Sequence, residues 1–417
     1  MKKTGSPFYK SILIAVCLAL MIYTVALAAS GDLDTTFSGD GRIMQSFGGY
    51  YHLGSNVAVQ ADGKVVAAGE RVTAAGTDFA IARYNPNGTL DTTFSGDGRQ
   101  VVNLGATDGI EGVAIQTDGK IVVGGETCDS RYTHCDVALV RLNSNGTLDT
   151  SFSGDGKVIT DTGNWDNGGK DLTLQGSKIL VSGYSEDAIG RVATVYRYLS
   201  DGSLDTTFSG DGILPIKFGE DDSFDAIVYY SGKIYVAGYS AISDYSVSDF
   251  ITARLNLDGT LDTTFSGDGW VKTSLGTEDY GNDLAISGGK VIVVGYSDAN
   301  IAILQYNASG ALDPTFSGDG KLRANLGFSS PGLNGVTIQA GKIVAAGRTG
   351  EDALLVRYTA AGNLDTTFSA DGIVTADWGG VNDWYRSVIF KNARLYVVGT
   401  SQTASDVLRF IIAAYKP

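Results

Sequence analysis

The stretch GTLDTTFSGDG at residues 88–98 carries the strongest structural signal in the chain, because seven near-identical copies of it occur. We call it the repeat motif. The copies occupy residues 31–41, 88–98, 146–156, 202–212, 259–269, 310–320 and 362–372. Their leucines follow one another at intervals of 51 to 58 residues. A period of this size is typical of solenoids, propellers and other repeat arrays.

The segment between two copies of the motif has the same pattern in every repeat. After residues 88–98 come a short alternating strand at 99–104, an apolar hairpin at 112–125 and a last strand at 136–143. The hairpin turn contains Asp118-Gly119, a pair that tight turns prefer because glycine adopts positive φ freely. The strands are rich in Val, Ile, Leu and Tyr with near period-two patterning, and no helical period is sustained after residue 28. The pattern predicts four strands in each of seven repeats.

These repeats predict an all-β fold: a seven-bladed β-propeller with four-stranded antiparallel blades, formed as a single domain by residues 29–417. A parallel β-helix would need shorter coils, and separate sandwich domains would need about 100 residues each. A closed ring removes exposed sheet edges. We therefore expect the first motif, at residues 33–37, to dock beside the last repeat and close the circle.

Residues 1–28 have the pattern of a signal peptide. Lys2, Lys3 and Lys10 form a basic start, and the apolar run at 12–28 ends in Ala-Leu-Ala. This predicts a helical signal segment; an uncleaved N-terminal anchor is the alternative, because the run is at the lower limit for spanning a bilayer. No second apolar stretch approaches 18 residues. We expect no other membrane insertion, and a location outside the cell, at its surface or in the periplasm.

The composition narrows the classes of function. The chain has 31 basic and 46 acidic residues and a formal charge of −15, which argues against nucleic-acid binding. Only His52 and His134 are available for a Ser-His-Asp relay or a multi-histidine metal centre. We therefore predict no catalytic set, no metal ligands and no cofactor. Calcium is the alternative, because Asp34 and Asp40 bracket hard oxygen donors, but the spacing differs from calcium loops and favours a structural turn.

Two cysteines remain after the predicted signal. Cys128 and Cys135 lie close together in GETCDSRYTHCDV, a polar loop of a chain predicted to be exported. In an oxidising compartment, this arrangement predicts a local disulfide bond. A metal site is the alternative, but it would need more ligands than His134 and a nearby aspartate provide.

The motif, the following hairpin and the Arg-Tyr/Leu-Asn strand together resemble the delta-60 repeat of bacterial exported proteins. The resemblance covers essentially all of residues 29–417. It implies a β-propeller-like fold, and it implies no enzymatic activity or catalytic residues. Pro314 in the sixth motif and Ala370 in the seventh depart from the pattern.

Candidate binding residues come from the a–b loops, which we define as the loops between the first and second strand of each repeat. These loops vary in sequence, combine aromatic with acidic side chains, and are expected near the axis of the ring. Aromatic faces beside carboxylates suit sugars, cationic groups or a protein surface. The alternative is that the acids are solvated and the aromatics plug the channel mouth. The candidates are Tyr51, Trp165, Asp166, Asp221, Asp222, Asp279, Tyr280, Asp383 and Trp384.

The sequence therefore predicts a monomeric, exported binding or scaffold module for an extracellular protein or glycan. It does not favour an enzyme, because no acid is distinguished from the others. A glycan hydrolase or lyase that uses the acidic a–b loops is one alternative, since such chemistry needs two facing carboxyl groups. A calcium-stabilised structural repeat protein is the other.

Overall fold

The strands predicted from the repeats are present throughout the described part of the chain. The computed structural model describes residues 29–131, 134–163, 166–242 and 246–417, and the predicted signal segment lies outside these residues. The described residues form strands, turns and loops, without a helix. Accordingly, no described helix is long and apolar enough to cross a membrane.

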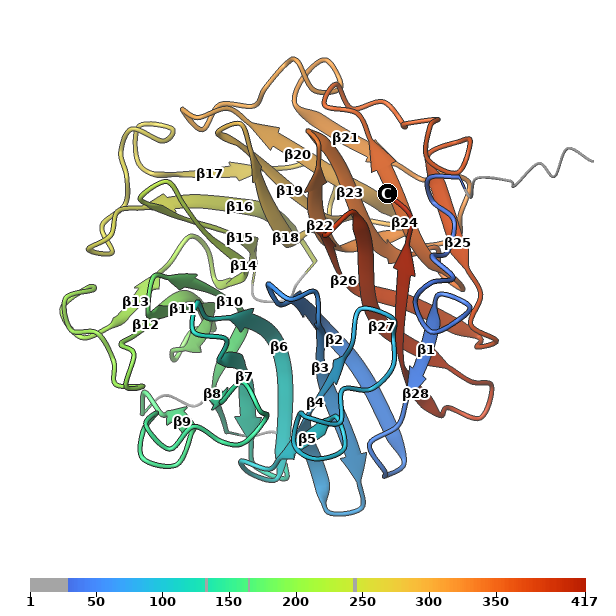
Figure 1. The fold of residues 1–417 in the computed structure, drawn as a ribbon. Helices are drawn as coiled ribbons and strands as arrows, with labels where there is room; N and C mark the ends of the chain where they lie inside the picture. The colour runs from blue at the N-terminus through green and yellow to red at the C-terminus, as the bar shows by residue number, and fades with distance from the viewer. Residues whose placement is uncertain (1–28, 132–133, 164–165, 243–245) are drawn as a thin grey trace, which may run out of the picture.

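Each structural unit is an antiparallel meander of four strands, shown by β2 (Tyr51–Val59), β3 (Val65–Thr73), β4 (Gly76–Tyr84) and β5 (Arg99–Val102). The strands equivalent to β2 surround the centre in Figure 1, and those equivalent to β5 lie outermost. The inner strands are β6 (Thr107–Ile115), β10 (Asn167–Gln175), β14 (Asp221–Tyr230), β18 (Asp279–Ser287), β22 (Gly332–Gln339) and β26 (Asn382–Lys391). The second strands are β7 (Ile121–Cys128), β11 (Lys178–Glu186), β15 (Lys233–Ala241), β19 (Lys290–Ser297), β23 (Lys342–Arg348) and β27 (Arg394–Gln402).

The third and outer strands complete these meanders. The third strands are β8 (Cys135–Leu142), β12 (Arg191–Tyr198), β16 (Ser248–Leu255), β20 (Asn300–Tyr306), β24 (Ala353–Tyr358) and β28 (Leu408–Tyr415). The outer strands are β9 (Lys157–Thr160), β13 (Ile213–Ile216), β17 (Trp270–Thr273), β21 (Lys321–Ala324), β25 (Ile373–Ala376) and β1 (Arg42–Gln45). Five sheets have four strands; the sixth has eight, because one parallel pair, Thr77 with Thr107, joins two neighbouring meanders.

The sheets are out of phase with the sequence repeat. The short strand after each motif, which the sequence places first in its own repeat, is the outer strand of the preceding meander. As a result β1 pairs with β28, and the first motif reaches the C-terminus through hydrogen bonds from Asp34 N to Ala414 O (2.8 Å) and Gly31 N to Lys416 O (2.9 Å). The expectation that the first motif docks beside the last repeat is confirmed. Inner strands also contact one another in turn from β2 to β26, and β26 contacts β2.

The core lies between neighbouring sheets. Phe94 of the motif is fully buried and packs with residues of two meanders, including Phe79 from one and Ile110 from the next. Burying a phenylalanine side chain contributes on the order of 2–3 kcal/mol. The same wedge position is fully buried in every repeat, at Phe37, Phe94, Phe152, Phe208, Phe265, Phe316 and Phe368.

The motif aspartate is the centre of a buried polar network. In one repeat, Asp91 Oδ1 accepts hydrogen bonds from the Thr93 N–H (3.1 Å) and hydroxyl (2.6 Å). Its Oδ2 accepts from Arg83 Nε (2.7 Å) and Lys64 Nζ (3.1 Å). The Arg83 guanidinium lies 4.8 Å from the centre of the Phe94 ring. The second motif aspartate holds its turn through the backbone N–H of the residue two positions on, as at Asp97. Calcium at the motif would have to displace these partners.

Candidate functional site

Every inner strand contains a β-bulge at the same height. The pairing of β6 with β7, for example, skips one residue between Ile110 and Gly112. A bulge leaves one residue out of the ladder and turns its side chain in a new direction. The skipped residues are all polar: Ser55, Glu111, Lys170, Asp225, Asn282, Asn334 and Arg386.

A glycine on the second strand accompanies each bulge. A Cβ atom on Gly125, for instance, would overlap the carbonyl oxygen of Gly109, so the bulged inner strand leaves no room for any side chain there. The same overlap with the inner strand would arise at Gly69, Gly125, Gly183, Gly238, Gly295, Gly347 and Gly399.

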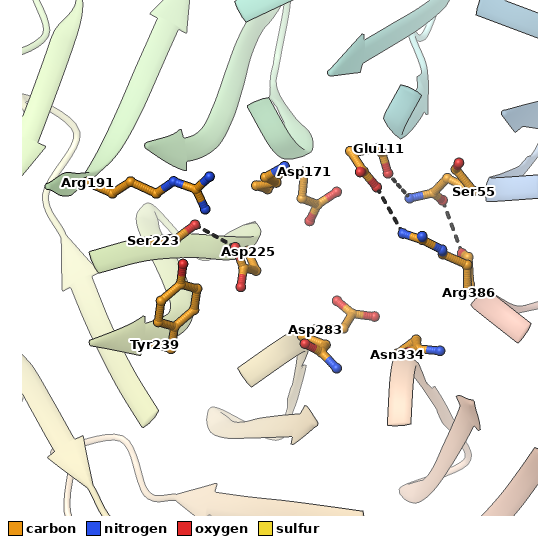
Figure 2. Close-up of a pocket in the computed structure, with 14 residues that line it drawn as sticks. Ser55, Glu111, Asp171, Arg191, Ser223, Asp225, Tyr239, Asp283, Asn334 and Arg386 are labelled. Carbon is orange, nitrogen blue, oxygen red and sulfur yellow. Dashed lines mark hydrogen bonds and ion pairs between the residues drawn. The ribbon is translucent and has the colours of Figure 1, made fainter. Parts of the chain in front are cut away.

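The skipped residues surround a cavity of about 340 Å³ at the centre of the ring of inner strands. Figure 2 shows their side chains converging on this space from all sides. All of the lining residues are polar or charged: Ser55, Asn56, Glu111, Lys170, Asp171, Arg191, Ser223, Asp225, Tyr239, Asn282, Asp283, Asn334, Arg386 and Ser387. Such a lining suits a hydrophilic ligand, since an apolar one would strip these groups of water without compensation.

Side chains of the lining connect neighbouring inner strands. Asp171 Oδ2 accepts from Ile227 N (3.0 Å), and Asp283 Oδ2 accepts from Val336 N (2.7 Å). Each of the two also accepts, through Oδ1, from the N–H of its own next residue. Burial raises the pKa of Asp283 to about 7. Burial, with the nearby Asp283, also raises the pKa of Asp171 well above its usual range.

One side of the cavity carries an arginine and tyrosines. Arg191, at the start of β12, lies 4.2 Å from the centre of the Tyr184 ring. Tyr239, on β15, also lines the cavity, and its hydroxyl donates to Asp221 (3.2 Å). The Tyr239 ring lies 4.8 Å from that of Tyr280, which stacks at 5.0 Å on a further tyrosine, Tyr296. These residues place aromatic surface beside the charged cavity.

Three of the sequence-predicted acids are structural residues of the loops. Asp222, Asp279 and Asp383 are almost completely buried. Their carboxylates accept N–H groups of the preceding a–b loop, such as Phe218 N (2.7 Å) and Leu275 N (2.6 Å). A side chain that turns inward to hold its own loop is a poor ligand contact, so these three do not enter the site described here.

The other sequence-predicted residues divide into two groups. Asp221 and Tyr280 contact Tyr239, so they lie next to the cavity. Asp166 instead accepts the Cys135 N–H (2.8 Å) on the third strand of its meander. Tyr51 and Trp384 are half-buried on β2 and β26, outside the lining. Trp165 lies outside the described residues.

The lining of the cavity was missed in the sequence because it lies within strands rather than in loops. Two signals mark it: a polar residue directly before the apolar alternation, as in EGVAIQ at 111–116 and KDLTLQ at 170–175, and the glycine that faces each bulge. The alternation itself is interrupted at this point, because the extra residue shifts the facing by one position.

A second group of acids lies at the last sheets. Carboxylate oxygens of Asp352, Asp377 and Asp383 lie within 4.8 Å of one another, an arrangement that could accept a divalent cation. Burial and the two neighbouring carboxylates raise the pKa of Asp352. Asp383 Oδ2 already accepts the Trp378 N–H (2.7 Å), so this residue also has a structural role.

The predicted disulfide bond between Cys128 and Cys135 is confirmed. The two residues face each other as the terminal pair of β7 and β8. The bond therefore closes the loop between these strands.

Stability is expected to reach its maximum near pH 5. Hydrogen bonds and the neighbouring cations outweigh burial and lower the pKa of six motif aspartates, so their contribution is full above pH 4 and is lost as the pH falls below that value. Burial raises the pKa of Glu70 to about 8 and that of Asp283 to about 7, so their contribution is lost as the pH rises through 7 to 8. Thermal melts from pH 2 to 9 should show a decline on both sides; a melting temperature still rising at pH 8 would contradict this. The six are Asp91, Asp149, Asp205, Asp262, Asp313 and Asp365.

Comparison with known proteins identifies the type of repeat. Six segments match the family model described as "Domain of unknown function (DUF5122) beta-propeller", at residues 60–94, 116–152, 177–208, 231–265, 288–316 and 341–368. The chain is therefore a β-propeller repeat protein. No curated protein sequence gives a significant match.

Several solved structures are similar in fold. An acylaminoacyl peptidase matches at 12% identity and a TM-score of 0.46 over 88% of this chain and 52% of that chain, so this chain spans about half its length. A protein of unknown function from Dyadobacter fermentans matches at 10% identity and a TM-score of 0.49 over 90% and 98%. The polysaccharide lyase Uly1 matches at 11% identity and a TM-score of 0.50 over 89% and 90%. At this identity the likeness concerns the fold alone.

Proposed function

We propose that this β-propeller repeat protein is a seven-bladed propeller of the delta-60 type that works as an exported glycan-binding module. Seven hydrophobic clusters lie between its sheets, and the ring of contacting inner strands includes β26 and β2. Each matched segment runs from a hairpin to a motif phenylalanine. A seventh such segment would begin near residue 392 and end at Phe37, across the two termini, which explains why six are matched.

The observation that supports glycan binding is the wholly polar cavity at the centre of the inner strands. Its volume of about 340 Å³ lies at the lower end of the range for small-molecule pockets. It therefore suits one end of a chain, or a small hydrophilic molecule, better than a folded partner. Asn282 and Asn334 each donate through Nδ2 to the neighbouring inner strand. Within the described residues, this leaves their Oδ1 atoms as acceptors for hydroxyl groups.

An extracellular location, at the surface or free, fits the disulfide and the signal-like pattern of residues 1–28. The bond would persist in an oxidising compartment and would be reduced in the cytosol. We place the protein outside the cytoplasm as a monomer on these grounds.

A glycan hydrolase or lyase is the second candidate, because two carboxyl groups of raised pKa, Asp171 and Asp283, line the same cavity. Against it, both oxygens of each residue accept backbone N–H groups that hold the strands. Release of reducing ends or unsaturated products from a bound glycan would favour the enzyme over the binding module.

Filling the cavity tests the proposal. Ser55 is a skipped residue of the lining, and Ser55→Trp should project an indole ring into the space. We expect the wild type to bind at least one class of oligosaccharide on a glycan array, and the variant to bind it at least tenfold more weakly with an unchanged far-UV spectrum. Thr117→Trp, on an exposed hairpin turn away from the cavity, is the matched control and should bind normally. No bound glycan, or full binding by Ser55→Trp, would refute the proposal.

A further inference from the structure

The cations of the cavity are already engaged by carboxylates that do not belong to its acidic side. Arg386 Nη1 lies 3.6 Å from Glu111 Oε2, on the side away from Arg191 in Figure 2. Lys170 Nζ lies 3.3 Å from Glu126, a residue of β7 behind the lining. These two pairs balance their own charges and leave no net positive charge to offset further acids.

Three lining aspartates have no such partner. Asp171, Asp225 and Asp283 form no ion pair with any lysine or arginine of the described chain. Their hydrogen bonds come from neutral donors: backbone N–H groups for Asp171 and Asp283, and the Ser223 hydroxyl (2.6 Å) for Asp225. Neutral donors fix the orientation of a carboxylate but do not balance its charge, and an unbalanced buried charge is costly.

The protonation behaviour of these residues agrees with a missing positive charge. Burial raises the pKa of Asp171, Asp225 and Asp283. Burial and the nearby Glu111 raise that of Glu70 to about 8. A cation among the aspartates would favour their ionised forms.

A metal ion does not fit these three aspartates. A group of acids able to share one ion needs ligand atoms a few ångströms apart. Among the described residues, that arrangement occurs at Asp352, Asp377 and Asp383, and not in the cavity. The cavity acids instead come from three different inner strands around a space large enough for an organic group.

We propose that the glycan bound in this cavity carries a free amino group, as an unacetylated amino sugar does, and that its ammonium lies among Asp171, Asp225 and Asp283. This inference rests on the proposed glycan-binding function. An ammonium offers three donors, which match carboxylates from several directions. The hydroxyl groups of the sugar then meet the amide oxygens of Asn282 and Asn334. The acidic excess of the whole chain draws cationic ligands to the same place.

Three oligosaccharides of equal length test this inference by titration calorimetry at pH 6 with the full mature chain: glucosamine, N-acetylglucosamine and glucose oligomers. We expect the glucosamine oligomer to bind at least tenfold more tightly than the other two. Raising the salt from 50 to 500 mM should weaken the glucosamine oligomer more than the glucose oligomer.

Asp225→Asn is the informative variant, because it keeps the shape and the acceptor for Ser223 while removing one charge. It should reduce the preference for the amine at least fivefold. Asp187→Asn, an exposed charge on the loop before β12, is the matched control and should leave it unchanged. Equal affinity for all three oligomers, or no binding of the glucosamine oligomer, would overturn the amine inference while leaving glycan binding to the array experiment. Failure of every glycan on the array overturns the proposed function.

Discussion

Replacing Asp205 with alanine is expected to destabilise the protein by about 3–5 kcal/mol, because it leaves a buried guanidinium without its counter-charge. Asp205 and Arg197 are each only 3% exposed, and Asp205 Oδ2 lies 2.8 Å from Arg197 Nε. The same oxygen accepts from Lys178 Nζ (2.6 Å), and Oδ1 accepts from the Thr207 hydroxyl. Urea titration followed by tryptophan fluorescence would measure the loss as a lower transition midpoint.

Two matched variants separate this network from a general effect of charge. Asp211→Ala removes the other motif aspartate, which is exposed and holds only the Ile213 N–H, and it should cost about 1 kcal/mol. Arg197→Gln should cost less than half as much as Asp205→Ala. The chain already contains this solution, since Gln305 Nε2 donates to the motif aspartate Asp313 at 2.9 Å. Equal losses for Asp205→Ala and Asp211→Ala would show that the buried network does not stabilise the fold.

The last repeat varies the same network in a way that the sequence does not announce. Ala414 stands where the other repeats have arginine or glutamine, so the motif aspartate Asp34 has lost that partner. Arg394, at the position of the usual lysine, forms the ion pair instead. The network therefore tolerates a change of partner but in each repeat provides a positive or donor group to the aspartate.

The repeat unit could be predicted from the sequence, because turn residues and two-residue periodicity are local properties of the chain. The phase of the sheets could not. Strand 99–102 follows the motif directly, and nothing in its own residues says whether it pairs with the strand before the motif or the one after. That choice is made by the hydrogen bonds of the motif itself, in which Asp91 N reaches back to Arg83 O (2.9 Å). The prediction of seven blades belongs to the proposal above.

The candidate site was harder to predict for a physical reason. An aspartate in a polar loop has the same sequence appearance whether it faces solvent or captures the N–H groups of its own loop. The spacing in LGTED (275–279) holds the distinction, because Asp279 returns to Leu275 N four residues earlier. Glu111 or Lys170, by contrast, would be taken as the exposed face of a strand, and only the bulge turns it toward the axis.

Removing residues 29–45 is expected to prevent the formation of a stable monomer. The deletion takes away β1, the outer strand of the last sheet, and exposes the edge of β28, which can then pair with other chains. It also removes Phe37, a fully buried wedge whose loss alone costs about 3–5 kcal/mol, out of a typical total stability of about 5–15 kcal/mol. Light scattering after size exclusion should show aggregates or oligomers, and thermal melting should lose its cooperative transition. A monomer with the wild-type melting temperature would contradict this expectation.

A circular permutant should restore what the truncation removes. In the six internal repeats, five residues separate the two members of an antiparallel bridge, such as Tyr84 and Leu90. The terminal bridge joins Tyr415 and Leu33 across the chain ends. A chain that runs from 46 to 417 and continues directly with residues 30–45 places five residues between Tyr415 and Leu33, which equals the internal spacing. This permutant should be monomeric and melt within a few degrees of the wild type, because the same strand closes the same sheet through a loop of the length that the repeat uses elsewhere. If it aggregates as the truncated chain does, covalent order rather than the missing strand controls the closure.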